Sequence, residues 1–74
     1  MAFNLTGREL VKILRGNGFK ESRRRGSHLI FSHQSTGVTV PVPLHGGNPP
    51  VPVGTLMAII KQSKLPKVLF KKSR

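Results

Sequence analysis

Cysteine is absent from this sequence of 74 residues, which excludes disulfide bonds and thiolate metal sites as means of stabilising the fold. Long apolar runs are also missing. The longest, Leu56–Ile60, is far shorter than the roughly 20 residues of a membrane-spanning helix. Residues 1–6 lack the apolar segment of a signal peptide. We therefore expect a soluble, cytoplasmic protein that does not bind membranes.

The length of the chain predicts one domain, residues 1–74, with a modest hydrophobic core. We expect the main part of this domain over about residues 6–65, followed by a basic C-terminal tail at 66–74, in which Val68, Leu69 and Phe70 either pack onto the core or stay exposed. A core of this size rarely contributes more than roughly 3–5 kcal/mol of net stability.

Acidic residues are scarce. The sequence has only Glu9 and Glu21 against 13 lysines and arginines, which gives a formal net charge of +11 and a pI near 12. A chain with this imbalance is expected to bind polyanions such as RNA, DNA or an acidic protein. An anionic membrane fits less well, because no basic amphipathic helix carries an aromatic apolar face. The charge alone is equally compatible with a ribosomal or nucleoid-packing protein.

The scarcity of acids also restricts the chemistry of any active site. Metal-dependent nucleases hold their ions with clustered carboxylates, and this chain has no aspartate. The spacing of His28, His33 and His45 matches no zinc-finger or zincin pattern. A Ser-His-Asp triad lacks its third member, and the P-loop and dinucleotide fingerprints are absent. We therefore expect neither a metal nor a cofactor.

The first predicted element is a helix over residues 6–16. Thr6 and Glu9 have the spacing of a capping box at its start, and apolar residues follow at helical intervals. We expect Gly16 and Gly18 to end the helix through the left-handed backbone conformation that glycine tolerates.

The apolar pattern then changes to the alternation typical of strands. Three strands are predicted, at residues 19–24, 27–33 and 38–42. Pro41 places the third at a sheet edge, because proline cannot donate to a ladder. A proline- and glycine-rich loop at 43–53 precedes a second helix, which begins near Gly54 and Thr55 and ends at Pro66. The predicted fold is α+β, with two helices on one face of a three-stranded antiparallel sheet.

Residues 23–31 read Arg-Arg-Arg-Gly-Ser-His-Leu-Ile-Phe, with His28 at the start of the second strand. Histidine acid–base chemistry among cations suits one reaction, the attack of a ribose 2′-hydroxyl on its own neighbouring phosphate, because RNA supplies the nucleophile itself. DNA lacks this hydroxyl and cannot react in the same way. The alternative is that His28 only contacts a phosphate or a base.

Cations near His28 are expected to bind RNA phosphates. The candidates are Lys20, Arg23, Arg24 and Arg25, with Lys61 and Lys64 as further contributors. His33 lies in a turn region, where we expect it to be solvated. His45 lies in the long loop, where it is either exposed or part of a second site.

Several segments, taken together, resemble the HicA (YcfA-like) family over about residues 6–65. They are Gly-Arg-Glu-Leu-Val-Lys-Ile-Leu, Asn-Gly-Phe, Arg-Arg-Gly-Ser-His-Leu-Ile-Phe, Val-Thr-Val-Pro, Val-Gly-Thr-Leu and Ile-Ile-Lys-Gln. The family comprises the toxins of HicA–HicB toxin–antitoxin pairs. The resemblance implies a double-stranded-RNA-binding-domain-like fold and metal-independent cleavage of messenger RNA that inhibits translation. The alternative function is that of a non-catalytic RNA-binding module with the same fold.

The resemblance also implies roles for individual residues. The catalytic histidine of the family falls on His28, and Gly26 and Ser27 fit the motif before it, with Ser27 a further phosphate contact. Gly54 and Thr55 open the last helix. His45 lies in a Val-Pro-Leu-His segment similar to one in many members, although the proline-rich stretch at 42–53 departs from the usual pattern. A HicB-like antitoxin is expected to cover His28.

Overall fold

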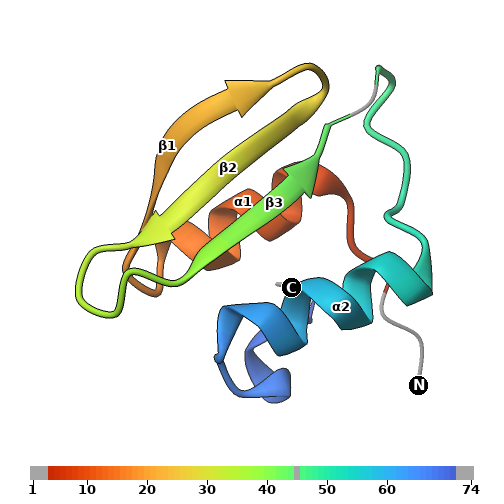
Figure 1. Cartoon of the computed structure of the whole chain (residues 1–74). Coiled ribbons are helices and arrows are strands. Elements are labelled where there is room, and N and C mark those ends of the chain that lie inside the picture. Colours follow the sequence, from red (N-terminus) through yellow and green to blue (C-terminus); the bar gives the residue numbers. More distant parts are fainter. Residues whose placement is uncertain (1–3, 45, 72–74) are drawn as a thin grey trace.

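The computed structural model describes residues 4–44 and 46–71, which fold in the order α-β-β-β-α (Figure 1). The elements are α1 (Gly7–Arg15), β1 (Phe19–Arg25), β2 (His28–His33), β3 (Thr39–Pro43), α2 (Val53–Ser63) and a short 3₁₀ helix, η1 (Lys67–Leu69). The strands form one antiparallel sheet in the order β1-β2-β3. The predicted α+β fold is therefore confirmed, with strand boundaries close to the expected ones.

Helix α1 begins with the predicted capping box. The Thr6 hydroxyl accepts from the Glu9 N–H at 3.2 Å, and the Thr6 N–H donates to Glu9 Oε1 at 2.9 Å. At the other end the prediction is only partly correct. Gly16 keeps a right-handed conformation with φ of −69°, and the left-handed residue is Gly18, with φ of 92°. The turn into β1 therefore depends on glycine at position 18, where a side chain would strain the backbone.

Both helices pack on the same face of the sheet. β2 and β3 pair Phe31 with Val40 and Leu29 with Val42, and all four side chains are buried. The helices add Leu10 and Leu14 from α1 and Leu56, Ile59 and Ile60 from α2 to the same core cluster. We call the opposite side of the sheet the outer face. In the described part of the chain, no helix covers it (Figure 1).

Strand β1 contains a β-bulge. Glu21 and Arg23 pair with consecutive residues of β2, so Ser22 between them has no partner. The extra residue reverses the alternation of side chains along the strand. Arg23 and Arg25 consequently lie on the outer face, while Arg24 lies on the helix side.

The proline-rich loop between β3 and α2 packs against the segment that precedes α1. The Val51 N–H donates to the Leu5 carbonyl at 2.7 Å, and the adjacent residues form an isolated antiparallel bridge. Asn48 Oδ1 accepts from the Arg8 N–H in the first turn of α1, at 3.4 Å. His45 lies outside the described residues. These hydrogen bonds attach the loop to the start of α1, so the loop is packed against the domain and does more than connect β3 to α2.

Helix α2 begins at Val53, next to the predicted start near Gly54, but its end differs from the prediction. It ends at Ser63, because Lys64 adopts a left-handed conformation with φ of 65°, so the chain leaves the helix before it reaches Pro66. Within residues 4–44 and 46–71, no helix combines the length and apolar character that crossing a membrane requires.

The C-terminal segment contributes to the core, a role that the sequence left open. Phe70 is fully buried, and its N–H donates to the Lys67 carbonyl at 3.0 Å at the end of η1. Val68 and Leu69 stay 64% and 38% exposed. The expected basic tail is therefore anchored to the protein by one aromatic side chain.

We expect Phe70→Ala to lower the free energy of unfolding by about 3–5 kcal/mol, because truncating a fully buried phenylalanine leaves a cavity. Val68→Ala, in the same segment but exposed, should change it by less than about 0.5 kcal/mol. Urea denaturation followed by circular dichroism measures both values. A Phe70→Ala protein that is already unfolded without urea meets the expectation, whereas equal effects of the two substitutions would contradict it.

Candidate functional site

His28 is the first residue of β2 and follows a tight turn. Gly26 has a φ of 59° and Ser27 does not have a positive φ, as in a type II′ hairpin turn, which favours glycine at its first central position. The Ser27 carbonyl accepts from the Leu44 N–H at 2.7 Å, which ties the turn to the chain beyond β3. Backbone contacts therefore hold His28 from the turn, from β1 and from β3.

The side chain of His28 lies on the outer face, because its neighbour Leu29 faces the core. Its cross-strand partners are Arg25 on β1 and Pro43 on β3. His28 is exposed, and its imidazole makes no hydrogen bond or ion pair among the described residues. The imidazole is therefore open to a ligand.

The pairing of the strands arranges the outer face in three rows, each with one residue from every strand. The rows are Arg25–His28–Pro43, Arg23–Ile30–Pro41 and Lys20–Ser32–Thr39. Each row contains one exposed cation from β1. Directly opposite Cβ atoms in an antiparallel pair are about 4.5–5.5 Å apart, so the guanidinium of Arg25 can reach a group bound at His28.

Neither acidic residue lies on the outer face. Glu9 belongs to the capping box of α1. Glu21 pairs with Phe31 on the helix side, where its Oε1 lies 3.7 Å from Nη2 of Arg15. Among residues 4–44 and 46–71, no group of three or more His, Cys, Asp or Glu side chains could hold a metal ion. The outer face is thus a surface of positive charge around one imidazole.

The structure places five of the other predicted residues away from this surface. Arg24 lies on the helix side of β1, and Lys61 and Lys64 are exposed on and just after α2, which covers that same side. Gly54 and Thr55 are in the exposed first turn of α2. The expected phosphate contacts therefore divide between two sides of the sheet.

His33 is half-buried and has structural contacts, so the prediction that it is simply solvated was wrong. Its Nδ1 accepts from the N–H groups of Ser35 and Thr36 at 3.1 and 3.2 Å. The ring meets Phe19 edge-on, with centroids 5.0 Å apart, and it fills the space beside Gly18. The sequence did contain a signal for this structural role, because the turn that follows His33 has backbone N–H groups that need acceptors.

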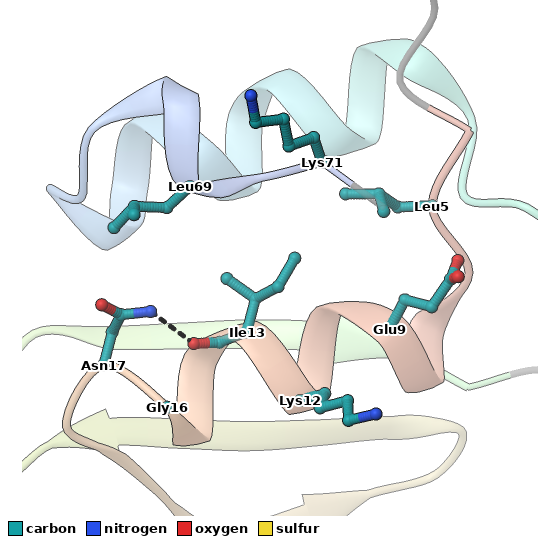
Figure 2. A pocket seen from close by; sticks show the side chains of 8 residues that line it. All are labelled: Leu5, Glu9, Lys12, Ile13, Gly16, Asn17, Leu69 and Lys71. Atoms are coloured by element: carbon teal, nitrogen blue, oxygen red, sulfur yellow. Dashed lines mark hydrogen bonds between the residues drawn. The ribbon is translucent and has the colours of Figure 1, made fainter. Parts of the chain in front are cut away.

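A cavity of about 420 Å³ lies between α1 and the C-terminal segment, on the helix side of the protein (Figure 2). Its lining residues are Leu5, Glu9, Lys12, Ile13, Gly16, Asn17, Leu69 and Lys71. Glu9 is engaged in the capping box, and the Asn17 side chain donates to the Ile13 carbonyl at 2.8 Å (Figure 2). This cavity therefore offers no free acid–base pair and is separate from His28.

The two described histidines should respond differently to substitution. We expect His33→Ala to lower the free energy of unfolding by about 1–3 kcal/mol, because it removes the acceptor of two turn N–H groups and an aromatic contact. His28→Ala should change it by less than about 0.5 kcal/mol, because the exposed imidazole has no described partner. Urea denaturation of both variants tests the difference, and a destabilised His28→Ala protein would indicate a structural role.

Residues 7–65 match the model of a protein family described as HicA toxin of bacterial toxin-antitoxin. The matched region contains both α-helices and all three strands. No curated protein matches the sequence. Family membership implies a toxin with an antitoxin partner. Because the match extends over more than half of the chain, this protein belongs to the HicA family of toxins from bacterial toxin–antitoxin pairs.

Proposed function

We propose that this toxin is a metal-independent endoribonuclease that cleaves messenger RNA in the cytoplasm and thereby inhibits translation. The observation that carries the proposal is the setting of His28. It is an exposed imidazole on a helix-free sheet face, with a cation in its own row and in the next two rows, and without a carboxylate on that face. A polyanionic RNA backbone is the ligand that such a surface favours.

In the proposed reaction His28 accepts the proton of a ribose 2′-hydroxyl. The 2′-oxygen forms a bond to the neighbouring phosphorus, and the bond between phosphorus and the 5′-oxygen breaks. A second group protonates the departing oxygen, and His45 is our candidate for it. Solvent then restores both protonation states. The products are a 2′,3′-cyclic phosphate and a 5′-hydroxyl.

Cations on the outer face would stabilise the negative charge that builds up on the phosphorane oxygens. Arg25 is nearest in the sheet, since it pairs directly with His28. Ser27 is exposed in the adjoining turn and would add a hydroxyl donor. RNA supplies its own nucleophile, so the protein needs only to position the phosphate and move protons.

A non-catalytic RNA-binding module of the same fold is the second candidate. The same exposed cations favour it, because they would bind phosphates without any use of the imidazole. Cleavage and binding must therefore be measured separately.

We expect the purified toxin to cleave single-stranded messenger RNA in excess chelator. His28→Ala should slow cleavage by about 10²–10⁴-fold, the usual contribution of a positioned acid or base. End-group analysis should find 2′,3′-cyclic phosphates and 5′-hydroxyls, and an all-deoxy strand of the same sequence should stay intact.

The control is Gln34→Ala, which should cleave at the wild-type rate, because Gln34 is exposed in the connection between β2 and β3, at the opposite end of β2 from His28. Full activity of His28→Ala would refute His28 as the acid–base group. A requirement for Mg²⁺, or products with 5′-phosphates, would refute the mechanism. Binding without any cleavage by the wild type would establish the second candidate.

We further propose that the antitoxin presents carboxylates to the outer face and covers His28. A surface with cations in three rows and no acid is complementary to an acidic partner, and such charge steers association as well as blocking RNA.

In the complex with the cognate antitoxin, we expect hydrogen exchange to slow at residues 23–31, which contain His28. Association should also slow as salt increases, because screening weakens the steering. Unchanged exchange at these residues in a complex that no longer cleaves RNA would show that the antitoxin acts from another surface.

A further inference from the structure

We propose that Arg25 holds the scissile phosphate beside His28, that Arg23 holds the next phosphate, and that Arg24 takes no part in RNA binding. The inference rests on the proposed function and separates three consecutive arginines that are chemically identical. Their different positions in the sheet are the basis for the separation.

The rows of the outer face define which cation stands beside which central residue. Arg25 shares a row with His28, and Arg23 shares the next row with Ile30. Rows on one face of a strand repeat every two residues, about 6.4–6.8 Å apart. A phosphate whose neighbouring 2′-hydroxyl gives its proton to His28 is therefore within reach of Arg25 first, and the next phosphate along β1 lies toward Arg23.

Arg24 is excluded by the bulge at Ser22. It pairs with Leu29, whose side chain is buried beneath the helices, so Arg24 starts from the side of the sheet opposite His28. Without the bulge, regular alternation from the buried Phe19 would place Arg24 on the outer face and its two neighbours on the helix side. The extra residue places two arginines on the outer face together with His28, whereas regular alternation would place only one there.

Arg25 has the chemistry that this role requires. Its guanidinium presents a planar fork of N–H groups that matches two oxygens of one phosphate. In the part of the chain that the structure describes, Arg25 is exposed and has no acidic partner. The fork is therefore free to bind the phosphate on which charge develops.

Arg24 offers a matched control, because Arg24→Ala and Arg25→Ala remove the same charge from adjacent exposed positions. We expect Arg25→Ala to lower kcat by about 10²-fold, the cost of one lost donor to a developing oxyanion. Arg24→Ala should stay within about threefold of wild type, because a charge that does not touch the RNA is screened by salt. Arg23→Ala should raise KM more than it lowers kcat, and Arg25→Lys should recover part of the activity, since it keeps the charge but not the fork.

Binding gives a readout that does not depend on cleavage. On a His28→Ala background, the affinity for a single-stranded RNA is measured as a function of salt. The slope of log K against log salt should flatten by about 0.7 for each lost phosphate contact. Arg23→Ala and Arg25→Ala should each show this change, and Arg24→Ala should not.

The outcomes separate the two proposals. Equal losses of kcat and equal slopes for Arg24→Ala and Arg25→Ala would overturn this inference and leave the ribonuclease proposal standing. A wild-type protein that never cleaves RNA, but whose salt slope changes for Arg25→Ala and not for Arg24→Ala, would overturn the reaction and retain the assignment of binding residues. Urea denaturation confirms that all variants are folded.

Discussion

The alternation of side chains along β2 is the constraint on which the candidate site depends. Leu29 and Phe31 are buried under the helices. Exposing either side chain to water would lower the stability of the fold by about 1.5–3 kcal/mol. Because the side-chain period of a strand is two, their burial forces His28 and Ile30 to the other side. β2 is the central strand and is paired on both edges, so it cannot slip by one residue without exchanging the two sets. The imidazole is thus positioned by the burial of its apolar neighbours.

Packing at one corner of the molecule reinforces that position. A Cβ on Gly7, the first residue of α1, would lie 2.6 Å from the Pro43 carbonyl oxygen, so only glycine allows this close approach. Pro43 is the partner of His28 on β3, and Leu44 donates to the turn at Ser27. The start of α1, the end of β3 and the hairpin turn therefore meet at the row that contains His28. A site held by rigid elements in this way loses little entropy when a ligand binds.

The distribution of charge follows the two sides of the sheet. Both acids are engaged around α1, whereas the cations of β1 on the outer face have no acidic partner among the described residues. Repulsion between these cations opposes folding, and a bound polyanion relieves it. The same cations discourage a second chain from pairing with the exposed edge of β1. On the other edge strand, β3, Pro41 discourages such pairing because proline has no N–H to donate. One surface thus combines attraction for polyanions with protection against edge-to-edge association.

The elements that depend on neighbouring residues could be predicted from the sequence. The capping box of Thr6 and Glu9 is a local signal, and so are the two-residue alternation of β2 and the glycine in its turn. The absence of aspartate and cysteine left histidine acid–base chemistry, and the resemblance to the HicA family assigned it to His28. These conclusions need no knowledge of which distant residues touch.

The remaining features depend on contacts between distant segments, which only the tertiary structure decides. Phe70 joins the same buried cluster as residues of α1 and α2, and His33 is held by Phe19 and by the turn that follows it. Above all, the sequence could not show which arginines share a face with His28. That choice is made by the bulge at Ser22, which arises because Glu21 and Arg23 pair with consecutive residues of β2. The register comes from the burial of Phe19 and Phe31 under α1, a non-local balance that three identical neighbouring side chains do not encode.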